Sequence, residues 1–299
     1  MSETALPRNN DSLSGFGFAL GAYLLWGFLP LYMKALAHIP PVEIIAHRAI
    51  WSLPVAGMVL ILSRRTADLK RALATPSMIG MAAVTATIIS LNWGIYIWAI
   101  ATDHALDAAL GYYINPLFSI FLGAMLLGES LSRLQKIAIA LAALAVIVLT
   151  VQVGRLPLVA LSLTLTWAAY AYCKKQLPIG PNQGFFLEVL LMTPFALAFI
   201  LWLGWTGQGH FMAGNAMDSA LLFGCGLVTA VPLILYANGA KLLRLSTIGI
   251  MQYIAPTMIF LTAVFLFNEP FGTAQAIAFA MIWAALALYS VSMFRRRGG

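Results

Sequence analysis

Charged residues are scarce in this sequence. Asp, Glu, Lys and Arg make up only 9% of the 299 residues and hydrophobic residues make up 62%, whereas an average soluble domain is about 25% charged. So few charged side chains cannot cover the surface of a soluble fold of this size, and the same composition excludes a disordered chain, collagen and a coiled coil. The sequence therefore predicts a polytopic membrane protein. Because one crossing takes about 20 apolar residues, roughly ten helices with short loops fit into this length.

Cysteines and catalytic motifs are also few or absent. The two cysteines, Cys173 and Cys225, lie in or beside apolar segments, which predicts neither a disulfide framework nor a metal site. The net charge of +7 comes from basic residues that lie between the apolar runs rather than in one domain, which argues against a nucleic-acid partner. We find no P-loop, no H-E-x-x-H and no nucleophile elbow. We therefore expect no enzyme, no catalytic residue and no cofactor.

Ten apolar segments are bounded by charged residues or by Gly, Pro and Asn, and each predicts a transmembrane helix. They span residues 16–36, 43–62, 77–100, 108–127, 134–152, 157–173, 184–203, 218–238, 247–267 and 274–293. The expected fold class is an all-α polytopic membrane protein. We expect a cytoplasmic tail at 1–15, a first five-helix repeat at 16–152, a second at 157–294 and a basic cytoplasmic tail at 295–299.

The basic residues predict the orientation of these helices. With the N-terminus in the cytoplasm, 14 of the 17 Lys and Arg residues fall in cytoplasmic segments, while only Lys34 and Arg155 fall on the other side and Arg48 lies inside the second helix. Lys and Arg near helix ends are retained on the cytoplasmic side. The sequence therefore predicts a multi-pass protein of the bacterial inner membrane with both termini in the cytoplasm.

The two halves of the chain align at an offset of 140 residues. The offset places Tyr113-Ile114-Asn115-Pro116 on Tyr253-Ile254-Ala255-Pro256, Glu129 on Glu269, Gln135 on Gln275 and Arg48 on Glu188. Each half has five predicted helices, an odd number, so the halves must cross the membrane in opposite directions. Inverted repeats of this kind surround a central substrate site in many transporters. The repeat favours a transporter over an enzyme or a receptor.

Several stretches resemble a known family. They are Trp26-Gly27-Phe28-Leu29-Pro30-Leu31-Tyr32 with Lys34, Glu43 with His47-Arg48, and Asn92-Trp93 through Tyr112-Tyr113-Ile114-Asn115-Pro116. Together with the Glu turn that follows the Pro-containing helix of each half, they resemble the RarD-like branch of the drug/metabolite transporter (DMT) superfamily, EamA type, over residues 16–293. The resemblance implies similarity to YddG-type amino acid exporters. It also implies that helices 1, 3, 4, 6, 8 and 9 surround the cavity while helices 5 and 10 brace the outside.

Polar and aromatic residues share faces of the predicted helices at the helical period. The candidate substrate-binding residues are Trp26, Asn92, Trp93, Tyr96, Tyr112, Asn115, Trp167, Tyr236 and Gln252. Each has a structural alternative: an amide can hold helices together or satisfy a carbonyl freed by proline, and a tryptophan can pack in the core or lie in the interfacial belt.

Two charged residues lie within predicted helices and are candidates for a charge or gating role. Arg48 lies near the outer end of the second helix and Glu188 near the cytoplasmic end of the seventh, too far apart for a direct salt bridge. Both can snorkel to the nearer interface. Arg48 can instead attract a carboxylate at the outer mouth. His47 is expected at the interface. The sequence gives no positive sign of ion coupling.

The leading hypothesis is a secondary transporter that exports small metabolites by alternating access, and the aromatic and weakly polar candidates favour apolar or aromatic amino acids. A broad drug or lipophile exporter of the chloramphenicol type is the alternative, and a non-transporting scaffold or receptor is a third. The expected partners are a small-molecule substrate and the lipid bilayer. Two predicted helices carry stripes of small side chains that allow close helix packing. The stripes are Ala138, Ala142 and Ala145 in helix 5 and Ala276, Ala280, Ala284 and Ala287 in helix 10. The protein can therefore be a monomer or a homodimer through helices 5 and 10.

Overall fold

The computed structural model describes residues 12–62, 66–127, 131–176, 178–243 and 245–295, and within these ranges it contains helices and no strand. The helices are α1 (Leu13–Ala35), α2 (Pro41–Leu62), α3 (Ala67–Leu73), α4 (Pro76–Ala101), α5 (Ala105–Leu127), α6 (Arg133–Val153), α7 (Leu158–Gln176), α8 (Pro181–Thr206), α9 (Ala216–Leu242), α10 (Leu245–Met251), α11 (Ile254–Leu261), the π-helix η1 (Thr262–Leu266) and α12 (Thr273–Arg295). Of the described helices, eight are long and apolar enough to cross a membrane.

Each of the ten predicted segments is occupied by helix, with ends that shift by a few residues, and α3 is an additional short helix. The prediction of a continuous ninth helix is wrong. That segment is divided into α10, α11 and η1, with a turn at Gln252 and Tyr253. Pro256 weakens the helix at this point, because its ring clashes with the carbonyl four residues earlier, which is that of Gln252.

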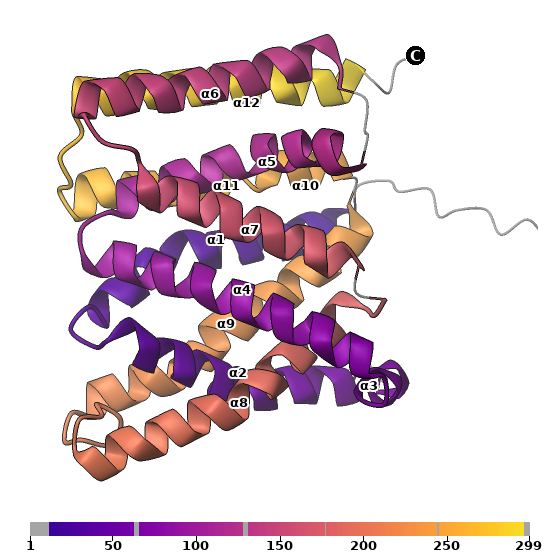
Figure 1. Cartoon of the computed structure of the whole chain (residues 1–299), viewed down its shortest axis with the longest axis vertical. Coiled ribbons are helices and arrows are strands. Elements are labelled where there is room, and N and C mark those ends of the chain that lie inside the picture. The colour runs from indigo at the N-terminus through magenta and orange to yellow at the C-terminus, as the bar shows by residue number, and fades with distance from the viewer. Residues whose placement is uncertain (1–11, 63–65, 128–130, 177, 244, 296–299) are drawn as a thin grey trace, which may run out of the picture.

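The helices are stacked in a flat arrangement of neighbouring pairs (Figure 1). The pair α6 and α12 lies at one end of the molecule and the pair α2 and α8 at the other, while α1, α4, α5, α7, α9 and α11 lie between them. The helix contacts repeat under the 140-residue offset. The offset places α1 on α7 and α4 on α9, and α1 contacts α9 as α7 contacts α4. It also places α5 on α11, and α5 contacts α7 as α11 contacts α1. Figure 1 also shows α6 and α12 running antiparallel.

The contact between α6 and α12 uses small side chains. On α6 the predicted stripe of Ala138, Ala142 and Ala145 is buried, which allows close approach of the two backbones. On α12 the alanines Ala276, Ala280, Ala284 and Ala287 are exposed in the single chain, so they do not pack on α6, and a contact with a second protomer stays a prediction. The buried face of α12 instead carries Ala278, Phe279, Ile282 and Ala285, because the large apolar side chains take the inward positions.

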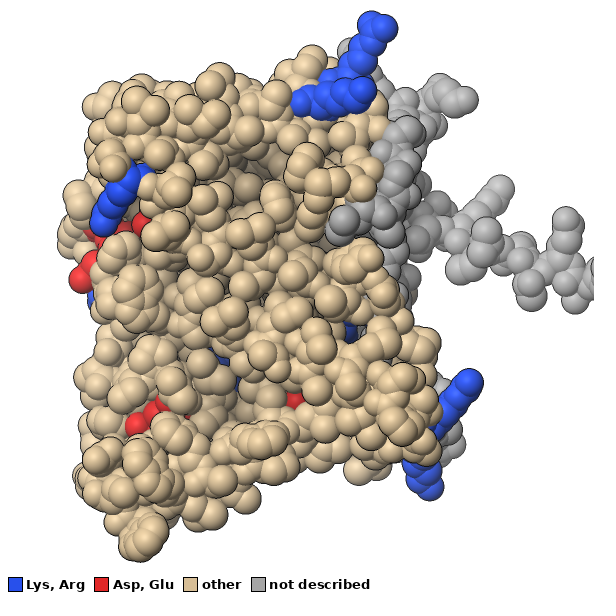
Figure 2. All heavy atoms as spheres, viewed as in Figure 1, with Lys and Arg blue, Asp and Glu red and all other residues tan. Residues whose placement is uncertain are grey.

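The surface of the bundle is apolar across its middle and charged at its two ends. In Figure 2 the central band of this face is almost wholly free of charged side chains, while basic side chains project at the right, over the start of α6 and over α3. Large apolar side chains project outward from the helices, among them Phe195, which is 80% exposed, and Phe265, which is 70% exposed. Such a surface requires a lipid environment.

A glutamate of the second half caps a helix of the first half. Glu269 follows η1, and its carboxylate oxygens accept the backbone N–H groups of Ala105 at 2.7 Å and Leu106 at 2.9 Å, at the start of α5. The carboxylate thereby satisfies two backbone donors that have no partner within the helix, and its buried negative charge lies at the positive end of the helix dipole. Glu269 therefore fixes the position of α5 relative to the second half. Its repeat counterpart, Glu129, lies outside the described residues.

Candidate functional site

The most deeply buried Lys or Arg side chain of the described residues lies in α2. Arg48 is only 4% exposed, so the prediction that it snorkels to the interface is wrong. Its Nε donates to Thr229 Oγ1 of α9 at 3.1 Å, and its Cζ lies 4.4 Å from the ring centroid of Trp93 on α4. Packing against α4 and α9 thus holds the guanidinium inside the bundle, about 10 Å along α2 from Pro41 at 1.5 Å per residue.

Aromatic residues from three other helices complete the surroundings of Arg48. Tyr32 of α1, Tyr96 of α4 and Tyr112 of α5 all lie close enough to interact electrostatically with its guanidinium, and the Tyr96 and Tyr112 rings are 5.8 Å apart. Five helices, α1, α2, α4, α5 and α9, therefore converge on this position. We call Arg48, Trp93, Tyr96, Tyr112 and Thr229 the arginine cluster.

Two predicted amides lie on the same helices as the arginine cluster. Asn92 donates from Nδ2 to the Leu163 carbonyl at 3.1 Å and to Thr166 Oγ1 at 2.8 Å, so it holds α4 against α7, as the structural alternative expected. The Oδ1 atoms of Asn92 and Asn115 are buried without a hydrogen-bond partner among the described residues. A buried acceptor without a donor is costly. The Oδ1 atom of each amide can therefore accept a hydrogen bond from a bound molecule.

Two of the remaining aromatic candidates, Trp26 and Tyr236, form a separate cluster. Trp26 of α1 packs against Tyr23, at 5.7 Å between ring centroids, and against Tyr236 of α9, at 5.6 Å. This group belongs to an apolar cluster with Met251 at the end of α10, away from the packing around α4 and α5. Gln252, predicted to lie within a helix, instead lies in the turn after α10.

The second predicted charge, Glu188 of α8, is also buried and does not snorkel. Its side chain is 2% exposed and pairs with Lys174 of α7 at 2.6 Å, while Tyr170 donates to it at 3.2 Å. Trp167 packs against Tyr170 at 5.9 Å. The sequence analysis placed Lys174 in a cytoplasmic segment and missed this ion pair. The 140-residue offset does not reveal the pair, because it places Lys174 on Lys34 but Glu188 on Arg48, and Lys34 is paired with Asp103 at 2.5 Å.

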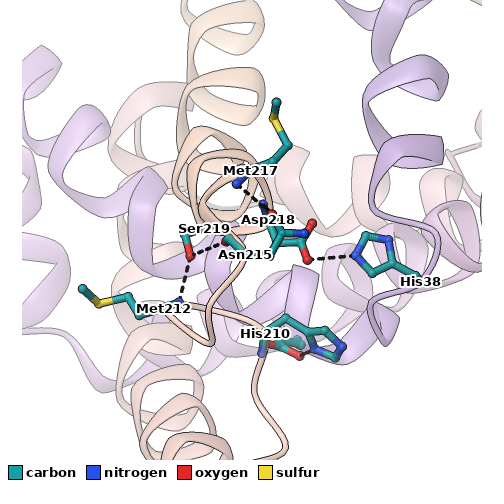
Figure 3. Close-up of polar contacts among 8 residues, drawn as sticks. His38, His210, Met212, Asn215, Met217, Asp218 and Ser219 are labelled. Carbon is teal, nitrogen blue, oxygen red and sulfur yellow. Dashed lines mark hydrogen bonds and ion pairs between the residues drawn. The ribbon is translucent and has the colours of Figure 1, made fainter.

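A third polar cluster lies at the N-terminal end of α2, and the sequence analysis missed it as well. The Glu43 carboxylate accepts the His210 backbone N–H at 2.7 Å and pairs with His210 Nδ1 at 2.8 Å. His38 points toward Asp218, as Figure 3 shows, with 3.0 Å between Nε2 and Oδ2. The first contact ties the segment between α8 and α9 to α2, and the second ties the first turn of α9 to the segment before α2. Nothing in the sequence connects these residues, because more than 160 positions separate the partners.

His47 lies between this cluster and the arginine cluster. It is 1% exposed, accepts from Trp51 Nε1 at 3.0 Å and lies 4.9 Å from the Phe211 ring centroid, so the expectation that it is interfacial is wrong. Within the described part of the chain, no three His, Cys, Asp or Glu side chains form a group that could hold a metal ion. The arrangement offers binding groups, namely a cation, aromatic rings and amides, rather than a nucleophile with its base.

Comparisons with known proteins agree with this geometry. The model of the EamA-like transporter family matches residues 13–151 and 156–291, once in each half. A Vibrio cholerae protein named "Uncharacterized transporter" is 40% identical, covering 95% of this chain and 94% of its own. A "Protein RarD" from Streptomyces exfoliatus is 39% identical, covering 97% and 92%. A crystal structure with 18% identity aligns with a TM-score of 0.63 over 96% of this chain and 100% of its own, which shows a shared fold.

Proposed function

The chain belongs to the EamA-like transporter family, and we propose that this multi-pass bacterial membrane transporter exports amino acids with apolar or aromatic side chains. The observation that carries the proposal is the arginine cluster. A cation, three aromatic rings and a hydroxyl from four helices meet inside the bundle. This set matches the chemistry of an amino acid, since rings contact an apolar side chain while polar groups take the charged ends.

We further propose that transport proceeds by alternating access between two inverted repeats. Two observations support this step: the family model matches each half separately, and the helix contacts are exchanged by the 140-residue offset. With both termini in the cytoplasm, α2 begins at the outer side, and the Glu43–His210 and His38–Asp218 contacts would form the outer closure. The Lys174–Glu188 pair would lie toward the cytoplasm.

Uptake into liposomes tests this proposal. The purified protein is reconstituted, and the entry of labelled phenylalanine, leucine, glycine and chloramphenicol is measured against protein-free liposomes. We expect saturable entry of phenylalanine and leucine and little entry of glycine, because glycine offers no side chain to the rings. Entry of chloramphenicol with no entry of amino acids would favour the drug exporter. No entry of any of the four would contradict the proposal.

A further inference from the structure

Arg48 is a buried charge whose hydrogen bonds are incomplete. Its Nε donates to Thr229 and its planar group lies over Trp93, but its Nη1 is buried and has no hydrogen-bond partner among the described residues. Removing a guanidinium from water costs several kcal/mol unless an opposite charge and hydrogen bonds compensate for it. A hydroxyl and an indole ring compensate for only part of that cost.

The acidic side chains described in the structure are engaged elsewhere. Asp103 pairs with Lys34, Glu188 with Lys174, Glu43 with His210 and Asp218 with His38. Glu269 caps α5, and Asp107, in the first turn of α5, has His104 and Arg155 as its charged neighbours. Thr229 is the hydrogen-bond partner of the Arg48 guanidinium, and its ionisable neighbours are three tyrosines and Cys225, with no carboxylate among them. Among the described residues, the arginine cluster therefore provides a positive charge and aromatic surface but no carboxylate.

We propose that Arg48 binds the carboxylate of the transported molecule, so that the substrate class is small carboxylates with an apolar or aromatic body. This inference rests on the proposed function of the same site and deepens it. A guanidinium matches a carboxylate through paired N–H donors. The free Oδ1 atoms of Asn92 and Asn115 are acceptors that an ammonium group can use. The carboxylate is therefore required for recognition, and the ammonium adds to it without being sufficient.

Four probes with one aromatic ring separate these requirements. Phenylalanine carries both charged groups, 3-phenylpropionate carries the carboxylate alone, phenethylamine carries the ammonium alone, and phenylalaninamide carries the ammonium with a neutral amide. Binding to the purified protein is measured directly, for example by the shift of the unfolding temperature with ligand concentration. We expect the first two probes to bind and the last two not to bind, since Arg48 repels a cation.

Substitution of Arg48 tests the residue itself. In Arg48→Gln and Arg48→Met we expect the affinity for 3-phenylpropionate to fall about ten- to a hundredfold, the loss of one charge-assisted hydrogen bond pair. The ligand-free Arg48→Met protein should unfold at the same or a higher temperature than the wild type, since an incompletely paired buried charge has been removed. A merely structural arginine would instead lower the unfolding temperature. Arg133→Gln, at an exposed position at the start of α6, is the control and should bind like the wild type.

The outcomes separate this inference from the proposed function. Equal binding of the amide and the acid, or an unchanged preference for the acid in Arg48→Gln, would overturn the role of Arg48 even if saturable uptake is found. Binding of the carboxylates without uptake would leave Arg48 as a carboxylate site and remove the transport proposal. Absence of binding of all four probes to folded protein would overturn the inference.

Discussion

Glu269 accepts the backbone N–H of Ala105 through a 2.7 Å hydrogen bond, although the two residues are 164 positions apart and belong to different halves of the chain. The short turn between η1 and α12 of the second half therefore anchors α5, a helix of the first half that contributes Tyr112 to the arginine cluster. The cap gives Glu269 a structural role in a protein that is poor in charge.

Replacing Glu269 tests this role. In Glu269→Gln one carboxylate oxygen becomes a donor that faces a backbone N–H, so one buried N–H loses its acceptor. We expect a loss of about 1–3 kcal/mol in the free energy of unfolding, seen as a lower unfolding temperature of the purified protein. Asp103→Asn is the control, because that side chain is 63% exposed, and it should change stability by less than about 1 kcal/mol. Equal effects of the two changes would contradict the capping role.

A second prediction concerns the buried ion pair between Lys174 of α7 and Glu188 of α8. Lys174→Met leaves the Glu188 carboxylate buried with Tyr170 as its remaining donor, which should cost about 3–5 kcal/mol of unfolding free energy. The double change with Glu188→Met should recover most of that loss, because no unpaired charge remains.

The matched control is Lys34→Met at the equivalent position of the first half. The Lys34 and Asp103 side chains are 31% and 63% exposed, and an exposed pair contributes only about 0–1 kcal/mol. Thermal unfolding of the four proteins measures the difference. A double variant as unstable as Lys174→Met alone would argue against a cost from the unpaired carboxylate.

Trp93 should matter for substrate binding through its contact with Arg48. Trp93→Ala removes a cation–π contact worth about 0.5–2 kcal/mol, so the affinity for 3-phenylpropionate should weaken about two- to thirtyfold. Trp93→Phe should retain part of it. Trp98 of the same helix is 44% exposed and stacks on His104, so Trp98→Ala should bind like the wild type. A loss confined to Trp98→Ala would place the site elsewhere.

Orientation in the membrane is tested with two threonines at opposite ends of described helices. Thr102 follows α4 and Thr66 precedes α3, and both are exposed. In a background without Cys173 and Cys225, a cysteine at position 102 should react with an impermeant maleimide added to whole cells. A cysteine at position 66 should react only after the cells are opened. The reverse pattern would overturn the orientation inferred from the Lys and Arg distribution.

The existence of the helices could be predicted from the sequence, because apolar runs of membrane length are a local property. The break between α10 and α11 could not. Pro116 and Pro256 occupy equivalent positions, yet α5 continues through Pro116 while the other segment breaks before Pro256. A proline weakens a helix wherever it stands, but the neighbouring helices decide whether the chain remains helical across it.

The candidate site could be predicted in part. Trp93, Tyr96 and Tyr112 were found from their spacing on helix faces, and the structure brings them to Arg48. Snorkelling was the wrong expectation for Arg48, because the burial of a side chain depends on which helices pack over it. The contacts of Arg48 with Thr229 and of Glu188 with Lys174 could not be predicted for the same reason. Trp26 and Tyr236 meet each other in a second cluster rather than at the arginine.

Substrate counterflow tests the central claim most directly. Liposomes containing the protein are loaded with unlabelled phenylalanine and diluted into labelled phenylalanine, with no ion gradient present. A carrier that exposes one site alternately to the two sides should accumulate the label transiently above its outside concentration, and Arg48→Gln should not. Two controls are needed: the wild-type protein must unfold cooperatively, and the loaded phenylalanine must stay inside the liposomes. If both hold and the label enters no faster than in protein-free liposomes, the account is contradicted.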